Sequence, residues 1–229
     1  MVFTPHIASM DMFVKSRHYI KYINSMFPIM SHEYIEGEMM KEKWGSFSED
    51  ERIAICRALG HFHAEIGKKL TREMAMGTGV KIDMSSDLHP EVKSDYNRLV
   101  IDPNVPEEWR TLIKETKTIF DKTMDMGVFQ FIHNDSHHEN ILIKDKKISG
   151  IIDFGSAEYG EIAKEFSRYI RDYPDYFKHI VSAYEDESGN KLSNQRLVSH
   201  ALLSGFVDIV ESYHKGGKDQ LSAEKSIEK

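Results

Sequence analysis

Two polar clusters on either side of a short hairpin constrain the fold of this 229-residue chain more than any other feature. The first cluster is His-Asn-Asp-Ser-His-His-Glu-Asn at 133–140, and it follows the apolar run 128–132. Two further apolar runs, 141–143 and 148–152, enclose a polar turn. Short apolar runs around such a turn predict paired strands. The second cluster, Asp-Phe-Gly at 153–155, follows directly, so the hairpin brings both clusters to one place.

The order of these residues resembles the aminoglycoside phosphotransferase and choline kinase superfamily, which has a protein-kinase-like fold. In that family His-x-Asp is followed by four residues, Asn, a short hairpin and Asp-Phe-Gly. The family loop usually has a sequence like HGDLHPENIL, and here Ser136 and His138 stand at its Leu and Pro positions. The resemblance implies transfer of the γ-phosphoryl group of ATP or GTP to a hydroxyl of a small molecule.

The same resemblance implies a role for each oxygen-bearing residue of the two clusters. Asp135 is expected to be the base that accepts the proton of the substrate hydroxyl. Asn140 and Asp153 are expected to hold Mg²⁺, a hard cation that prefers oxygen ligands. His133 is expected to shape the loop, and Gly155 to allow a tight turn where a side chain would obstruct the backbone.

The resemblance extends to both sides of the hairpin. Residues 33–38 are similar to the hinge between the two lobes of the family, which implies that the backbone of Glu33, Tyr34 and Ile35 contacts the adenine. After the Asp-Phe-Gly tripeptide, Gly160-Glu161 and Glu165-Phe166-Ser167 stand where the family often carries Gly-Asp and a helix with Asp-(Phe/Leu)-Ala.

The segment before the hinge departs from the family. Only about thirty residues precede Glu33, and no glycine occurs before Gly37, so a phosphate-covering glycine loop is not expected. Apolar residues at helical spacing predict a helix over 12–23, followed by a strand that leads into the hinge. We therefore predict an α+β fold with three parts. They are a remnant of the small β-lobe with the hinge at 1–36, a mostly helical kinase-like large lobe at 37–217 and a frayed tail at 218–229.

Helical signals dominate the proposed large lobe. Ser48 and Glu51 form a capping box, which predicts a helix that runs to about Gly67. Glycines and prolines interrupt residues 71–105, which are predicted to be irregular. One-sided apolar stripes predict further helices at 106–124, 162–170, 176–184 and 194–213.

Composition limits the class of partner and the compartment. The net charge of −7 argues against a general nucleic-acid binder. No run of about twenty apolar residues predicts a membrane span, and no signal-peptide pattern opens the chain. A single cysteine, Cys56, fits a reducing cytoplasm. The acidic balance is compatible with a cationic acceptor, and the family resemblance implies an aminoglycoside-like or amino-alcohol acceptor. Six acidic residues are candidate contacts for it: Glu158, Asp172, Asp175, Glu185, Asp186 and Glu187.

Two other interpretations stay open at this point. His133, Asp135, His137 and His138 could bind zinc in a hydrolase, although that leaves Asn140 and the Asp-Phe-Gly tripeptide without a role. Alternatively, the chain is an impaired or incomplete kinase-like protein that needs a second chain to supply the missing lobe.

Overall fold

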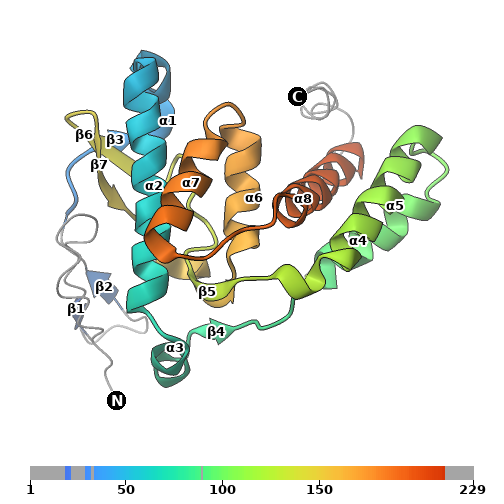
Figure 1. Cartoon of the computed structure of the whole chain (residues 1–229), viewed down its shortest axis with the longest axis horizontal. Coiled ribbons are helices and arrows are strands. Elements are labelled where there is room, and N and C mark those ends of the chain that lie inside the picture. Colours follow the sequence, from blue (N-terminus) through green and yellow to red (C-terminus); the bar gives the residue numbers. More distant parts are fainter. Residues whose placement is uncertain (1–18, 22–28, 32–33, 89, 215–229) are drawn as a thin grey trace.

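The computed structural model describes residues 19–21, 29–31, 34–88 and 90–214 (Figure 1). Within them the chain is mostly helical and carries three small β-sheets. The strands are β1 (Tyr19–Lys21), β2 (Ile29–Ser31), β3 (Glu38–Met39), β4 (Lys81–Ile82), β5 (Phe129–Ile132), β6 (Ile141–Lys144), β7 (Lys147–Ile151) and β8 (Glu158–Glu161). The α-helices are α1 (Met40–Lys43), α2 (Glu49–Lys69), α3 (Arg72–Thr78), α4 (Pro90–Ile101), α5 (Glu107–Lys122), α6 (Ile162–Asp172), α7 (Phe177–Ser188) and α8 (Asn194–His214).

The predicted hairpin is present as β6 and β7. Lys144 pairs with Lys147, so the turn consists of Asp145 and Lys146, which both have positive φ angles of 51° and 62°. Two left-handed residues in succession form the tight turn that matches the twist of paired strands. Strand β3 pairs with β6 through Glu38 and Ile143, which attaches the hinge segment to the hairpin.

A sheet that the sequence pattern did not predict positions the first polar cluster. Strand β8 lies between β5, to which it is antiparallel, and β4, to which it is parallel. Ile132, the last residue of β5, pairs with Glu158, the first residue of β8. The loop at 133–140 therefore leaves the sheet beside the start of β8.

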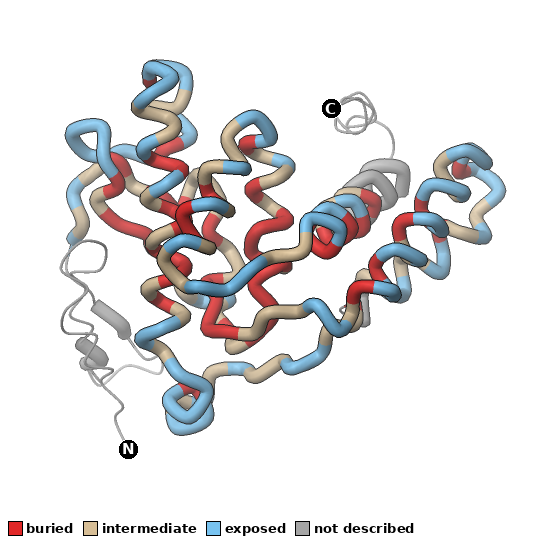
Figure 2. The backbone as a smooth tube through the Cα atoms, viewed as in Figure 1, coloured by how far each residue is buried: buried red, intermediate tan, exposed pale blue. Residues whose placement is uncertain are grey.

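Helix α2 forms the centre of the main core and packs against α7. Its capping box is confirmed, because the Glu51 amide donates to Ser48 Oγ at 3.3 Å and the Ser48 amide donates to Glu51 Oε2 at 2.9 Å. A Cβ atom at Gly60 would lie 2.3 Å from the Ile180 carbonyl oxygen and 2.9 Å from Ala183 Cβ. The two helices can approach this closely only because position 60 has no side chain. Figure 2 shows buried backbone in α2 and α7, which lie against each other.

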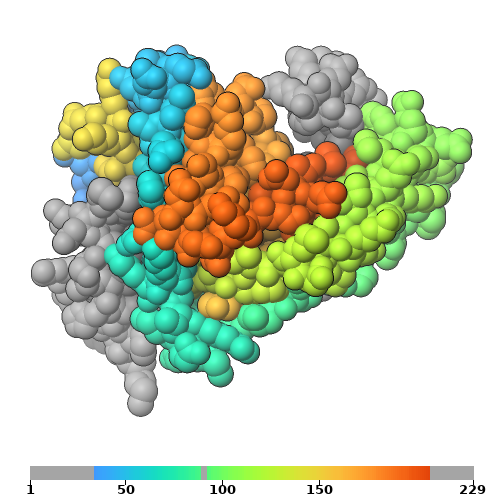
Figure 3. Space-filling model, in the orientation of Figure 1, coloured from blue at the N-terminus to red at the C-terminus, as the bar shows by residue number. Residues whose placement is uncertain are grey.

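Helices α4, α5 and α8 form a second, smaller core. Its buried residues include Leu99 from α4, Ile113 and Phe120 from α5, and Leu203 from α8. Figure 1 shows α4 and α5 side by side, extending away from the hairpin, and Figure 3 shows α8 lying against α5. Because α6 packs against α8, this smaller core adjoins the strand β8 and its following helix.

The segment 71–105, predicted to be irregular, instead contains α3, β4 and α4. Two of its breakers lie at the ends of helices: Gly79, with φ of 76°, ends α3, and Pro90 begins α4. Thr71 caps α3 by accepting the Met74 amide. Helix α4 has an apolar stripe that packs on the second core and contains Val92, Tyr96, Leu99 and Val100. The prediction failed because it weighed glycine and proline above this spacing.

One boundary also differs from the prediction. Tyr19–Lys21 is a strand paired with Ile29–Ser31, not the end of a helix, and the remainder of the predicted helix lies outside the described residues. Pairing between segments has overridden the local periodicity here. The α8 cap is Ser193, whose hydroxyl oxygen accepts the Arg196 amide at 3.3 Å. Among the described residues, no helix is long and apolar enough to cross a membrane.

Candidate active site

The ring of His133 ties the first polar cluster to the second. It is fully buried, and its Nε2 donates to the Ile152 carbonyl oxygen at 2.9 Å. Its Nδ1 accepts the Asp135 amide at 3.2 Å, and its centroid lies 4.3 Å from that of Phe154. Because Nδ1 accepts a hydrogen bond, the neutral ring carries its proton on Nε2. The geometry is that of a loop-shaping residue with both ring nitrogens engaged.

Asn140 connects Asp135 to the strand that leads to Asp153. Its Nδ2 donates to the Asp135 carbonyl oxygen at 2.9 Å and lies 3.4 Å from Asp135 Oδ2. The Asn140 carbonyl oxygen accepts the Ile152 amide at 2.9 Å. Within the described part of the chain no hydrogen bond engages Asn140 Oδ1, because the amide nitrogen faces the loop. That oxygen is therefore available to a cation.

Asp153 lies at the end of the hairpin in an unusual backbone conformation. Its φ and ψ angles are both 64°, in the left-handed region that residues other than glycine seldom occupy. The side chain is exposed, and Oδ1 accepts the Gly155 amide at 3.4 Å. A Cβ atom at Gly155 would lie 3.2 Å from this same Oδ1. Gly155 thus keeps space for the carboxylate in the 3₁₀ turn Phe154–Ser156, and it has no positive φ angle of its own.

The oxygen atoms of Asn140 and Asp153 suit magnesium better than zinc. Mg²⁺ keeps several waters and usually takes one or two protein oxygens together with substrate phosphates. Among the described residues, no three His, Cys, Asp or Glu side chains converge as a metal site. The His137 ring is 3.8 Å from Asp135, and that of His138 is 3.7 Å from Asp172. The zinc interpretation therefore finds no ligand set in this structure.

The hinge segment lies on the hairpin. Glu33 is outside the described residues, and the Tyr34 side chain is 82% exposed. Ile35 covers Gly150 of β7 so closely that a Cβ atom there would be 2.7 Å from Ile35 Cγ2. A cavity of about 520 Å³ is lined by Tyr34 and the hairpin turn, and neither Asp135 nor Asp153 lines it.

Glu165 on α6, to which the sequence assigned no role, holds the backbone of the loop. Its buried carboxylate accepts the Asn134 amide at 2.5 Å, the Ser136 amide at 3.3 Å and the Ser136 hydroxyl. Asn134 itself has a left-handed φ of 61°. Burial works against the charge, but the His63 ring and the donors of Ser136 and Asn134 outweigh it and lower the pKa of Glu165. Its place in the Asp-(Phe/Leu)-Ala frame was the signal in the sequence.

Arg168 lies one turn after Glu165 and forms an ion pair with the candidate base. Its Nη1 is 2.8 Å from Asp135 Oδ1, and both side chains are about one-third exposed, at 34% and 30%. One face of α6 therefore supplies both the carboxylate that holds the loop and the cation that contacts Asp135. The sequence contained no signal for this pair.

A cavity of about 330 Å³ adjoins the loop on the side of Asn134 and Arg168. Other residues of its lining come from β4, β8, α6, α8 and the segment before α4: Lys81, Asp87, Leu88, Glu158, Lys164, Arg171 and His200. Glu158 is buried and lies 2.8 Å from Lys81 and 3.2 Å from Lys164. Lys164 also contacts Asp83 at 2.7 Å. The wall is thus an array of paired charges.

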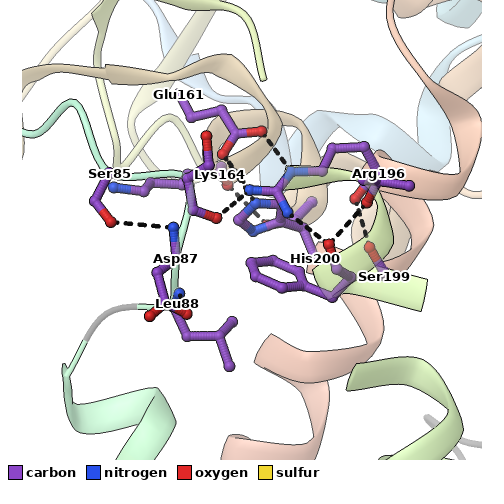
Figure 4. Close-up of polar contacts among 12 residues, drawn as sticks. Ser85, Asp87, Leu88, Glu161, Lys164, Arg196, Ser199 and His200 are labelled. Atoms are coloured by element: carbon purple, nitrogen blue, oxygen red, sulfur yellow. Dashed lines mark hydrogen bonds and ion pairs between the residues drawn. The ribbon is translucent and has the colours of Figure 1, made fainter. Parts of the chain in front are cut away.

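A buried ionic network fixes one side of this cavity (Figure 4). Arg196 from α8 donates to both carboxylate oxygens of Glu161, at 2.7 and 2.6 Å, and to the carbonyl oxygens of Phe120 and Ser86. His200 lies 3.3 Å from Glu161 (Figure 4). Burial disfavours the charged Glu161, but Arg196 and His200 outweigh it and lower the pKa of its carboxyl. The network joins α8 to β8 and to the segment before α4.

The six acidic candidates for a cationic acceptor do not gather at one place. Glu158 alone lines the cavity beside the loop, and it is paired with lysines. Glu185 contacts Lys191, and Glu187 contacts Lys68 of α2. The others are Asp172 beside His138, Asp186 near Ser182, and the exposed Asp175.

Comparisons with known proteins agree with this architecture. Residues 23–193 match the model of a phosphotransferase enzyme family. No curated protein matches the sequence significantly. Three solved structures illustrate the similarity. The GDP complex of aminoglycoside 2'-phosphotransferase-IIIa has a TM-score of 0.68 and 15% identity, over 92% of this chain and 72% of that one. The streptomycin–ATP ternary complex of APH(2")-IIa has a TM-score of 0.56 and 19% identity, over 90% and 73%.

The third is a macrolide 2'-phosphotransferase from Brachybacterium faecium, with a TM-score of 0.54 and 16% identity, over 76% of this chain and 59% of that one. At these identities the similarity is evidence for the fold. The fold is kinase-like, with a mostly helical large lobe that carries the hairpin, as the sequence predicted.

Proposed function

The chain belongs to the phosphotransferase enzyme family, and on that premise we propose that it transfers the γ-phosphoryl group of ATP or GTP to a hydroxyl of a small molecule. The observation that carries the proposal is the hydrogen-bonded connection of Asp135, Asn140 and the strand before Asp153. Phosphoryl transfer requires an aligned hydroxyl and neutralised phosphate charge more than covalent chemistry. Here the Asp135 carboxylate would align the hydroxyl, and oxygen atoms of Asn140 and Asp153 would hold the cation that neutralises the phosphates.

Asp135 is the proposed base. As the acceptor oxygen bonds to the γ-phosphorus, the bond between that phosphorus and the bridging oxygen breaks, and the nucleoside diphosphate leaves. The proton of the hydroxyl passes to the Asp135 carboxylate. Two neighbours orient this carboxylate: Asn140 Nδ2 at 3.4 Å from Oδ2 and Arg168 at 2.8 Å from Oδ1.

Asn140 Oδ1 and the Asp153 carboxylate are the proposed ligands of Mg²⁺. The bound ion would neutralise the phosphate oxygens of the nucleotide. The left-handed backbone of Asp153 supports the assignment, because strained conformations cluster at functional sites. The absence of a side chain at Gly155 also leaves room at Oδ1.

The backbone of residues 33–35 is the proposed contact for the adenine. Supporting this, Ile35 packs over Gly150, three positions before Asp153 on the same stretch of chain. If a nucleotide binds between the hinge and the end of β7, its base contacts the segment 1–36 and its phosphates contact the segment 37–217. This is the division into lobes that we propose.

Thermal melting of the full chain with Mg-ATP or Mg-GTP tests nucleotide binding. Ligand at about a hundred times its dissociation constant stabilises the folded state by about 2.7 kcal/mol, or roughly 5–10 °C for a chain of this size. Asp153→Asn should abolish the Mg²⁺-dependent part of the shift. Asp145→Asn is the matched control, because Asp145 is also exposed and left-handed on the same hairpin. Equal shifts in both variants would contradict the metal assignment.

Transfer of labelled γ-phosphate to a panel of hydroxylated acceptors tests the chemistry. Asp135→Asn should lose transfer and keep the melting shift with Mg-nucleotide. Full turnover in this variant would show that Asp135 is not the base. No shift and no transfer by a well-folded wild-type chain would contradict the proposed activity of the chain alone.

A further inference from the structure

The cavity beside Asn134 and Arg168 is placed to hold the phosphoryl acceptor. Arg168 lines it and also contacts the candidate base Asp135, which is not itself part of the lining. Its volume of about 330 Å³ is at the lower end of the range for small-molecule sites. An acceptor in this cavity would therefore be a small molecule, and its hydroxyl would have to extend past Arg168 to reach Asp135. This step rests on the proposed function.

The carboxylates of the cavity wall are already engaged, so they are poorly placed to bind an ammonium group. Glu165 accepts hydrogen bonds from the loop. Glu158 contacts Lys81 and Lys164 at 2.8 and 3.2 Å. Asp87 contacts Lys93 at 2.7 Å and accepts the Leu88 amide at 2.8 Å. A cationic acceptor would have to displace a lysine or a backbone donor from one of these groups.

Arg168 is the exception among the charged groups of this wall. Within the described residues its guanidinium makes one hydrogen bond, to Asp135, although a guanidinium carries five N–H donors in a planar fork. The side chain is only about one-third exposed, at 34%. Such a fork matches the geometry of a carboxylate or a phosphate group. Donors that remain unused in a partly buried cation favour an anionic partner.

We propose that the acceptor carries an anionic group, a carboxylate or a phosphate, and that Arg168 binds this group while it stays paired with Asp135. One guanidinium would then bridge the acceptor and the base and bring the hydroxyl of the same molecule to Asp135. The acceptor class is a small hydroxy acid or a hydroxylated phosphate ester. Arg168 acts as a positioning residue that also selects the acceptor by charge.

Anion binding is tested first by melting of the full chain at constant ionic strength. Inorganic phosphate and malonate should raise the melting temperature of the wild type more than sodium chloride or choline does. Arg168→Gln should lose this response. Arg98→Gln should keep it, because Arg98 on α4 also pairs with one carboxylate, Asp95 at 2.7 Å, outside the cavity. Arg168→Lys, which keeps the charge without the fork, should respond weakly and covers the case in which the glutamine variant fails to fold.

Saturating Mg-ATP distinguishes an acceptor site from a nucleotide site. If the cavity holds the acceptor, the shifts caused by anion and nucleotide should add. If nucleotide abolishes the anion response, Arg168 serves the nucleotide phosphates and the proposal is overturned. Because the melting experiment needs no turnover, its outcome is separate from that of the transfer assay.

Transfer to matched acceptors tests the class directly, with a hydroxy acid, a sugar phosphate, choline and kanamycin as substrates. The anionic acceptors should be preferred, and the first two separate carboxylate from phosphate recognition. In Arg168→Gln the KM for the preferred acceptor should rise about ten- to a hundredfold, as for the loss of a charge-assisted contact. Preferred transfer to choline or kanamycin would overturn the proposal and leave the phosphotransferase assignment intact.

Discussion

Replacing Glu165 by Gln should loosen the loop at 133–140 and destabilise the chain. The carboxylate is buried and accepts hydrogen bonds from the Asn134 amide, the Ser136 amide and the Ser136 hydroxyl. Gln keeps the shape but presents an NH₂ group to at least one of these donors. Leaving one buried donor unpaired and weakening the others costs about 2–3 kcal/mol. For a chain of 150–250 residues this lowers the melting temperature by about 4–12 °C.

The same substitution should remove a pH-dependent part of the stability. The folded-state pKa of Glu165 lies below the ordinary glutamate value of 4.5. Its charged form therefore stabilises the native state above that value, and this contribution disappears as the pH falls through the lower folded-state pKa. The difference in melting temperature between wild type and Glu165→Gln should be constant from about pH 6 to 8 and decrease below about pH 4.5.

Melting curves across this pH range, with Glu65→Gln as control, provide the measurement. Glu65 is a partly exposed residue of α2 that pairs with Lys69 at 2.9 Å, and such surface pairs contribute about 0.3–0.5 kcal/mol. The control should therefore melt within about 2 °C of the wild type. If Glu165→Gln behaves like the control at pH 7, or if its deficit is unchanged at acid pH, then Glu165 does not hold the loop as a carboxylate.

Three further perturbations test the surrounding structure. Gly60→Ala should destabilise the chain by about 3 kcal/mol or more in denaturant unfolding, because the new Cβ would lie 2.3 Å from a carbonyl oxygen of α7. The control is Gly205→Ala in α8, where the new Cβ has open space, and this variant should be neutral or stabilising. Glu161→Gln should cost about 3–5 kcal/mol by the same measurement, because it breaks the buried pair with Arg196; a loss below 1 kcal/mol would contradict this. Cys56 is buried, and burial raises the pKa of its thiol to about 12. A thiol reagent should therefore modify it only at the rate at which the chain unfolds. Rapid labelling of the native chain would show that the thiol is accessible and would contradict its burial.

Features that depend on neighbours in sequence were predictable. The capping box at Ser48 and Glu51 needs only residues three apart, and the hairpin turn at 145–146 needs only two adjacent left-handed residues. The order of the polar clusters sufficed to recognise the family because both lie within one hairpin and its flanks. Whether Asp135, Asn140 and Asp153 perform the roles implied by that resemblance stays a prediction.

Features that depend on pairing between distant segments were not predictable. Strand β8 has no alternation of apolar and polar residues, and it forms because β4 and β5 lie on either side of it. Arg168 joins Asp135 across 33 positions, and Arg196 reaches the Ser86 carbonyl oxygen across 110. A charged side chain on a helix looks solvated in the sequence, and only packing shows that α6 and α8 bring these guanidinium groups inward.

Contacts with β7, α6 and α1 hold the loop within the described residues. His133 attaches it to the end of β7, Glu165 attaches it to α6, and the Lys41 amide of α1 donates to the His138 carbonyl oxygen at 3.2 Å. The residues that make these contacts all lie after position 34 in the part of the chain that the structure describes. Weak binding of Mg-nucleotide by a chain that still binds anions through Arg168 would locate the defect at the proposed metal ligands or at residues 33–35, whereas loss of both in Glu165→Gln would locate it in the loop.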